Sequence, residues 1–168
     1  MNNTFIRPKT TPTPTKTNKT TSTISLCLLV LIWASAIYMY SISPAKVPMH
    51  FDFKGNVDRY DNKIMLFLLP IIGSVLFFVL HYISKKPYLY NYAQTITEKN
   101  YQAAYKSASN MMYILKLLIM VLFMAIQYVT YLAIKNANEK ESMWIVFIPI
   151  AAVLITSIVF ITKSFKEK

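Results

Sequence analysis

The chain has 168 residues, of which 55% are apolar and only 15% are charged, and its formal net charge is +11. Soluble domains carry about a quarter charged residues, so this composition excludes an ordinary soluble globular fold. The basic residues are scattered over loops and tails, which indicates contact with anionic lipid headgroups and argues against nucleic-acid binding.

The first 22 residues are rich in threonine, proline and lysine. Such a segment buries too little apolar area to offset the loss of chain entropy, so we predict a disordered tail over residues 1–22. The small residues Ala34, Ser35 and Ala36 follow a basic tail and an apolar run, as at the cleavage site of a signal peptide. The apolar run continues to Ile42, however, and this favours a retained first span.

Four apolar stretches are each long enough to cross a bilayer core of about 30 Å, which takes roughly 20 helical residues. Their continuous apolar character and the presence of only two glycines in the chain argue against a β-barrel. We predict an all-α membrane protein with four transmembrane helices and a short extracytoplasmic loop or hairpin between the first two. The predicted domain covers residues 23–163, with spans at about 24–42, 64–83, 112–134 and 143–162, and residues 164–168 form a basic tail.

The orientation follows from the basic residues that flank the predicted spans. The two tails and the connection after the second span hold eleven of these residues, and the opposite side holds six. Because basic flanks stay in the cytoplasm, we expect both termini to be cytoplasmic, with the first loop facing outward. Lys116, near the start of the third span, is expected to snorkel to the cytoplasmic interface.

The first loop, residues 43–63, alternates apolar and polar side chains as a strand does. Gly55 and Asn56 then predict a turn, and a small hairpin on the membrane surface fits this pattern. On such a strand His50 and Asp52 share one face. Asp61 or Asn62 is expected to cap the second span, and Pro70 is expected to bend it. The alternating residues are Val47, Met49, Phe51 and Phe53 against Pro48, His50, Asp52 and Lys54.

The connection between the second and third spans contains a capping-box sequence, Thr95-Ile96-Thr97-Glu98. From there we predict a helix that runs through Tyr101 and Tyr105 into the third span. Tyrosines just after the second span are typical of an aromatic belt at the membrane interface. The segment from Tyr92 to Tyr105 is a candidate contact for a cytoplasmic protein partner.

One set of loop residues resembles the bacterial membrane domain of unknown function 1648, which also forms the N-terminal half of SdpI-type immunity proteins. The resemblance covers roughly residues 26–120. In SdpI-type proteins it implies protection against an exported toxic peptide, coupled to sequestration of a repressor at the membrane. For a stand-alone domain it implies no activity. The residues that carry it are Pro48, His50, Phe51, Gly55, Asp58, Lys63 and Pro70, followed by Asn91, Tyr92, Glu98, Asn100 and Tyr105.

His50, Asp52, Asp58 and Asp61 are of the residue types that bind zinc or manganese. Their spacing matches no strong metal motif, so we predict no metal or cofactor and retain His50, Asp52 and Asp58 as minor candidates. A hydrogen-bonded loop, in which His50 and Asp58 bind backbone amides, Lys63 or Arg59, is favoured. Recognition of a peptide or another ligand is the next alternative. Lys63 itself is expected to snorkel or to pair with an aspartate.

The predicted spans contain no aspartate or glutamate, which argues against a proton-coupled pump. His81 and Gln127 are therefore expected to be interfacial or to bond across helices. Three functions remain: an immunity or signalling protein that senses or blocks a peptide or envelope signal, an accessory subunit of a membrane transport complex, and a metal-dependent membrane enzyme. We favour the first, which is not an enzyme and contacts lipid, an outer peptide ligand and a cytoplasmic protein.

Overall fold

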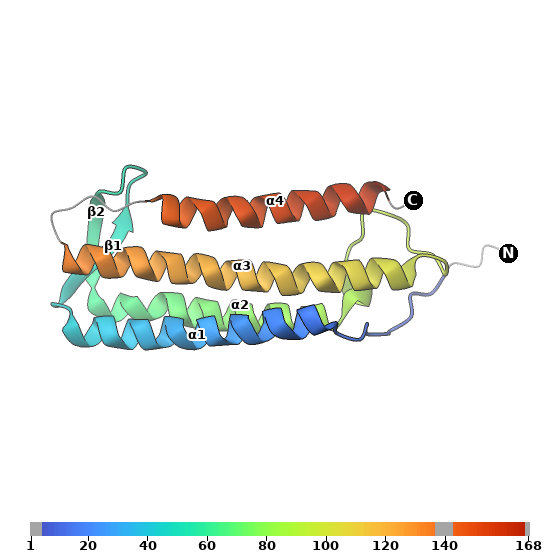
Figure 1. Cartoon of the computed structure of the whole chain (residues 1–168), viewed down its shortest axis with the longest axis horizontal. Helices are drawn as coiled ribbons and strands as arrows, with labels where there is room; N and C mark the ends of the chain where they lie inside the picture. Colours follow the sequence, from blue (N-terminus) through green and yellow to red (C-terminus); the bar gives the residue numbers. More distant parts are fainter. Residues whose placement is uncertain (1–4, 137–142, 167–168) are drawn as a thin grey trace.

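The computed structural model describes residues 5–136 and 143–166 and is mostly helical. Four helical segments are long and apolar enough to cross a membrane. The helices run side by side, with a β-hairpin at one end of the bundle and the first and last described residues, 5 and 166, at the other (Figure 1). The elements are α1 (Lys16–Ile42), β1 (Lys46–Phe51), β2 (Val57–Asn62), η1 (Lys63–Phe67), α2 (Leu68–Ser84), η2 (Pro87–Leu89), α3 (Tyr101–Lys135) and α4 (Trp144–Lys166).

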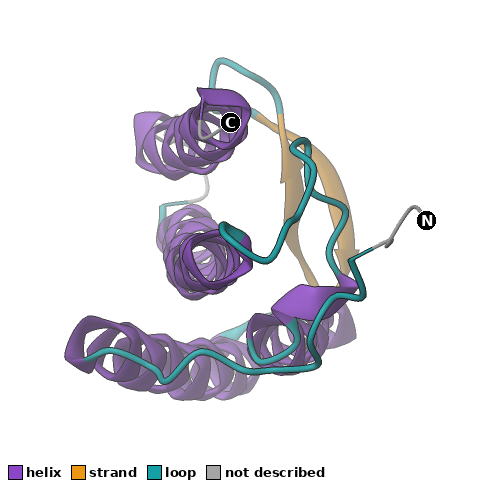
Figure 2. Cartoon of the chain, turned by 90° about the vertical axis from the view of Figure 1, so that its right-hand side faces the viewer, coloured by secondary structure: helices purple, strands orange, loops and turns teal. Residues whose placement is uncertain are grey.

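Helix α3 is the centre of the bundle and lies between α4 and the pair α1 and α2 (Figure 2). Leu29 and Ile32 of α1, Phe77 of α2 and Met120 of α3 form the main buried cluster. Many other leucine, isoleucine and valine side chains point outward from the bundle, as lipid contact requires. The bundle therefore buries one stripe of each helix and presents the rest to the bilayer.

Helix α1 begins at Lys16, well before the predicted start near residue 24. Thr15 caps it, because its Oγ accepts a hydrogen bond of 3.1 Å from the backbone amide of Asn18. Asn18 in turn donates to Asn110 of α3 at 2.7 Å. Residues 16–22, which we assigned to a disordered tail, are thus helical and packed. Residues 5–15, here called the strap, run along the same end of the bundle without regular structure.

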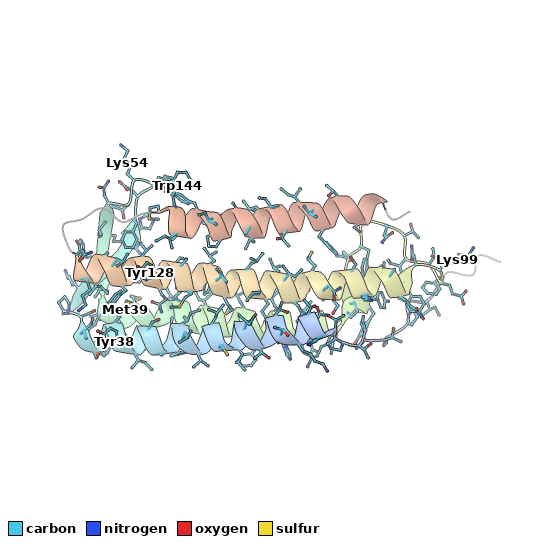
Figure 3. All side chains as sticks on the ribbon, viewed as in Figure 1. Tyr38, Met39, Lys54, Lys99, Tyr128 and Trp144 are labelled. Carbon is cyan, nitrogen blue, oxygen red and sulfur yellow. The ribbon has the colours of Figure 1, made fainter. Side chains whose placement is uncertain are left out.

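Strands β1 and β2 pair antiparallel and form a hairpin, here residues 46–62, so the fold is mostly helical and not strictly all-α. Val47 is fully buried and packs with Met39 of α1 and Leu66 of η1. At the tip, Phe53 reaches α4, where its ring lies 6.2 Å from that of Phe147. Figure 3 shows the tip residue Lys54 above the start of α4. The hairpin therefore rests on the ends of the helices.

Pro70, which we expected to bend the second span, lies in the first turn of α2. A first-turn proline breaks no hydrogen bond of its helix, because amides there have no partner within the helix. The preceding residues 63–67 form a 3₁₀ turn, and Asn62 caps it by accepting from the amide of Ile64 at 3.0 Å, as predicted for the start of this span.

The predicted capping box at residues 95–98 does not form, because α3 begins only at Tyr101. Asn100 organises the approach instead. Its Oδ1 accepts from the amide of Thr97 at 2.8 Å, and its Nδ2 donates to the carbonyl of Thr95 at 3.0 Å. The Asn100 side chain thus closes two hydrogen bonds within the loop that precedes α3.

Polar residues inside the bundle bond across helices. Gln127 of α3 donates to the carbonyl of Ile32 at 3.1 Å, as predicted. Lys116 is only 1% exposed and does not snorkel. Its amine donates to Ser22 of α1 at 2.9 Å and lies 3.4 Å from His81 of α2. These contacts join three helices near the end of the bundle that carries the strap.

Candidate functional site

The hairpin is the candidate site, and Lys63 fixes its base. The Lys63 amine donates to the carbonyls of Tyr40 at 3.2 Å and Ser43 at 3.4 Å, and it lies 4.5 Å from the centre of the Tyr40 ring. Carbonyls at a helix C-terminus lack partners within the helix and attract cations. Lys63, the first residue of η1, therefore caps the C-terminus of α1. Its amine binds these carbonyls and not an aspartate, so the second of its two expected roles, pairing with an aspartate, is wrong.

Asp52 builds the turn at the hairpin tip. Its Oδ1 accepts from the amides of Lys54 at 2.8 Å and Asn56 at 2.9 Å, and its Oδ2 accepts from the Asn56 side chain at 2.7 Å. Gly55 has φ 82°, a left-handed conformation that favours glycine. The hydrogen bonds from the Asn56 side chain and backbone lower the pKa of Asp52. Asp52 and Gly55 thus have structural roles in the turn.

Acid is expected to loosen this turn. The pKa of Asp52 is lower in the folded protein than in the unfolded chain. The ionised Asp52 carboxylate therefore stabilises the turn fully at pH values above the unfolded pKa, and this stabilisation is lost as the pH falls through the folded pKa. The amide proton shifts of Lys54 and Asn56, followed by NMR between neutral and acid pH, should report this transition. Asp52→Asn should remove it. If the amide shifts of Lys54 and Asn56 changed with a midpoint at or above the pKa of a free aspartate, Asp52 would not be stabilised in its ionised form by this turn.

His50 and Asp58 meet across the two strands. His50 Nδ1 lies 2.5 Å from Asp58 Oδ1, although the register places His50 opposite Arg59. Irregular register on both sides of His50 marks a bulge, and this redirects its ring toward Asp58. The side chains are 61% and 46% exposed, so the pair faces the surroundings of the hairpin. Beside it, Arg59 and Asp61 form a second exposed pair at 2.9 Å.

The three minor metal candidates do not come together. His50 and Asp58 touch, whereas both oxygens of Asp52 are held by Lys54 and Asn56 in the turn. Within residues 5–136 and 143–166, no group of three histidine, cysteine, aspartate or glutamate residues could hold an ion. The arrangement offers a hydrogen-bonding pair with one imidazole and one carboxylate at the surface.

A cavity of about 290 Å³ adjoins His50 of this pair, between the hairpin, the start of α2 and the last third of α3. Its walls are mostly apolar, with His50 and Arg59 at the hairpin side and Gln127 and Thr130 on α3. Sequence patterns predicted the hairpin residues but not the cavity, because α3 joins this site only in the folded bundle. The other lining residues are Met49, Phe51, Met65, Leu66, Leu68, Leu69, Ile72, Ile126 and Met143.

The remaining hairpin motif residues support its shape. Pro48 is buried in β1 and pairs in register with Tyr60 of β2. Each strand of a two-stranded sheet is an edge strand, so a proline is tolerated there. Phe51 is half-buried at the end of β1 and lines the cavity. Together with Gly55 and Lys63, these residues hold the pair of His50 and Asp58 in place.

The second motif set lies at the opposite end of the bundle. Tyr92 donates through its hydroxyl to the carbonyl of Pro87 at 2.8 Å and stacks on Tyr105 with ring centres 6.0 Å apart. Burial raises the pKa of Tyr92, so its phenol stays protonated at neutral pH. Asn91 and Glu98 are exposed. The structure therefore separates the two motif sets by the length of the bundle.

Residues 27–73 match the family model described as Domain of unknown function (DUF1648). This confirms the resemblance to that domain over this segment. The matched residues run from α1 through the whole hairpin into α2, so they include His50, Asp58 and Lys63. No curated protein and no solved structure matches the chain.

Proposed function

We propose that the chain is an integral membrane protein of SdpI-like immunity or signalling type, which senses or blocks a peptide or envelope signal through its hairpin. In this proposal the protein lies in a bacterial inner membrane, the hairpin faces outward and both termini are cytoplasmic. Four apolar helices support contact with a lipid bilayer, and the eleven-to-six distribution of basic flanking residues supports the orientation.

The exposed pair of His50 and Asp58, of which His50 lines a mostly apolar cavity, carries this proposal. A few polar groups at the mouth of an apolar pocket are typical of ligand sites, because the apolar walls supply affinity and the polar groups fix orientation. A peptide could place a hydrophobic side chain in the cavity and hydrogen-bond its backbone to the pair. Lys63 and Asp52 meanwhile hold the hairpin shape without blocking this surface.

Replacing both members of the pair, His50→Gln with Asp58→Asn, is expected to weaken protection. Hydrogen bonds to charged groups contribute about 1.5–3 kcal/mol, so the loss corresponds to roughly tenfold weaker recognition or more. The measurement is survival of cells challenged with an exported toxic peptide, at equal amounts of protein in the membrane.

The matched control is Asp61→Asn, at the neighbouring exposed pair. Asp61 is 40% exposed, lies on the same hairpin and, unlike its partner Arg59, does not line the cavity. This control should retain protection. Full tolerance in the His50 and Asp58 variant, or an equal loss in both variants, would refute the proposal.

The segment from Tyr92 to Tyr105 is proposed to contact a cytoplasmic protein partner. Exposed side chains there, including Glu98 and Lys99, and the basic character of this end support it. Figure 3 shows Lys99 at the end of the bundle opposite the hairpin. A signal at the hairpin would reach this end through α3, which extends over the whole length of the bundle.

A further inference from the structure

The strap packs on an aromatic surface at the start of α3. Phe5 contacts this surface, and its ring centre lies 5.9 Å from that of Tyr101. The strap therefore adds an aromatic side chain to a hydrophobic cluster whose other members lie more than 80 residues along the chain. These other members, here called the tyrosine surface, are Tyr88, Tyr92, Ile96, Tyr101, Ala104 and Tyr105.

Arg7 makes a second contact with the tyrosine surface. Its guanidinium lies over the Tyr92 ring, 5.6 Å from the ring centre, and its Nη1 donates to the carbonyl of Tyr90 at 3.0 Å. The negative face of an aromatic ring attracts such a cation. Ile6, between the two contact residues, is 88% exposed. Phe5 and Arg7 thus face the surface together, as alternate side chains of an extended segment do.

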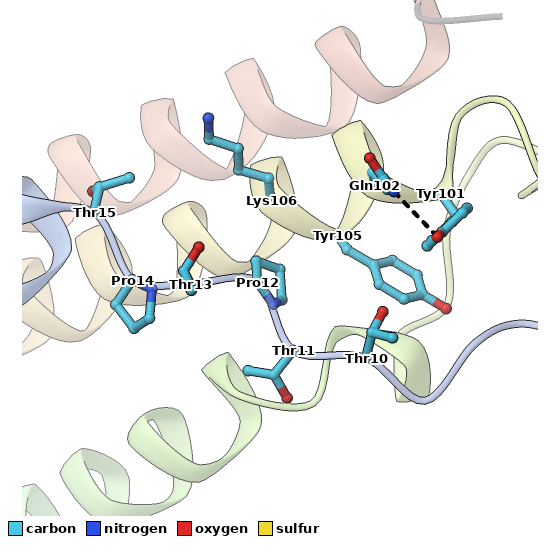
Figure 4. A pocket seen from close by; sticks show the side chains of 10 residues that line it. All are labelled: Thr10, Thr11, Pro12, Thr13, Pro14, Thr15, Tyr101, Gln102, Tyr105 and Lys106. Carbon is cyan, nitrogen blue, oxygen red and sulfur yellow. Dashed lines mark hydrogen bonds between the residues drawn. The ribbon is translucent and has the colours of Figure 1, made fainter.

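The rest of the strap is held loosely. Thr11 donates to the carbonyl of Lys85 at 2.7 Å. Beyond this bond, an open cavity of about 530 Å³ lies between strap residues 10–15 and the first turns of α3 (Figure 4). Well-packed protein interiors contain few voids larger than a water molecule. The strap therefore does not fill the groove in which it lies.

The charges of the two partners also oppose each other. The strap carries Arg7 and Lys9 and no acidic residue, while residues 85–106 carry four lysines and only Glu98. Like charges repel, although salt screens the repulsion between exposed groups. Within the described part of the chain, no ion pair fastens the strap. Aromatic contacts and two hydrogen bonds hold it, so another segment with the same side chains can replace it.

We propose that the tyrosine surface is a docking site for an extended peptide segment that has an aromatic residue two positions before an arginine. The strap is its resident occupant, and a cytoplasmic protein with such a segment binds by displacing the strap. The existence of this partner rests on the proposed cytoplasmic contact of residues 92–105. The docking site itself can be demonstrated with a peptide, even if the hairpin has no immunity or signalling role.

The test measures binding of a fluorescent peptide with the sequence of residues 5–15, by fluorescence anisotropy in neutral detergent. It compares the full chain with a form that lacks residues 2–13, which retains the Thr15 cap of α1. A tethered segment competes at an effective concentration in the millimolar range. The peptide should therefore bind the shortened form about tenfold more tightly than the full chain.

Peptide variants identify the side chains that are recognised. Phe5→Ala and Arg7→Gln should each weaken binding to the shortened form about fivefold, because they remove the contacts with Tyr101 and Tyr92. Lys9→Gln is the matched control, since it removes one positive charge at an exposed strap residue. It should bind at least as tightly as the original peptide, because the surrounding surface is itself basic.

A second protein variant guards against misfolding of the shortened form. The full-length chain with Phe5→Ala and Arg7→Gln keeps every segment of the protein, and it should bind the original peptide about as tightly as the shortened form does. Equal binding to the full chain and both opened forms, or no binding to either opened form, would overturn the proposal. Equal losses with Lys9→Gln and Arg7→Gln would do the same.

The oligomeric state tests a different occupant, the strap of a second copy. Native mass spectrometry of the full chain and of the shortened form measures it. We expect both forms to have the same oligomeric state. A full-length dimer that becomes a monomer when the strap is removed would show that straps are exchanged between copies, and the proposal of a displaceable resident strap would be wrong.

Discussion

Lys116→Ala is expected to destabilise the helix bundle by about 2–5 kcal/mol, the range for truncating a long buried side chain. The Lys116 side chain is 1% exposed, and its amine lies 4.7 Å from the Phe77 ring centre and 5.1 Å from that of Tyr113. Alanine would leave an empty space between these rings. It would also remove the hydrogen bond to Ser22 and the contact with His81, which join α1, α2 and α3.

Lys116→Met separates packing from charge. Methionine fills most of the same space, and replacing a buried charged group by an apolar side chain of similar volume is often nearly neutral. We therefore expect methionine to retain most of the stability that alanine loses. Unfolding by a denaturing detergent, followed by circular dichroism, measures both.

The control for this series is Lys99→Ala, an exposed lysine at the same end of the bundle, which should change stability little. Equal destabilisation by methionine and alanine would show that the ammonium itself holds the three helices together. That outcome would contradict the packing argument for Lys116.

The helices that form the bundle were predictable because lipid imposes a simple condition on sequence. A spanning helix needs about twenty apolar residues, and each of the four apolar runs meets this condition by itself. The hairpin strands also follow from a local signal, the alternation that begins at Val47. Local patterns of this kind reflect whether lipid or water surrounds each segment, so they predict the element without knowledge of its partners.

The errors arose where distant segments supply the partner. Lys63 binds the carbonyls of Tyr40 and Ser43, which lie 23 and 20 residues away, in place of a nearby aspartate. Residues 16–22 are helical because Asn18 and Ser22 bond to α3. Composition alone cannot reveal such contacts, since it describes only what a segment buries by itself.

In the candidate site, too, some features were predictable from local sequence and others were not. Sequence identified His50 and Asp58 as candidates, and these two side chains touch. It also placed Asp52 on the same face as His50, but Asp52 lies in the turn, just beyond the end of β1. The contact between His50 and Asp58 depends on a bulge, and a regular alternating pattern does not encode one.

Gly73→Leu is expected to destabilise the packing of α2 on α3 by about 1–3 kcal/mol, the usual cost of overpacking. A Cβ atom added at Gly73 would lie 3.1 Å from Phe123 Cδ2 of α3 and 3.7 Å from Leu29 Cδ1 of α1. Small residues allow transmembrane helices to approach closely, and a leucine here would push α2 away from both neighbours. Detergent-induced unfolding measures the effect.

Two further variants separate the steric effect of leucine at Gly73 from other effects of the substitution. Gly73→Ala requires only a small shift of the Phe123 ring, and alanine gains about 1 kcal/mol of helix propensity over glycine, so the net change should be near zero. Val75→Leu adds bulk to the same helix at a side chain that is 57% exposed, and it should be neutral. If Gly73→Leu were as stable as Val75→Leu, α2 would not be held closely against α3 at Gly73, and the steric argument would be refuted.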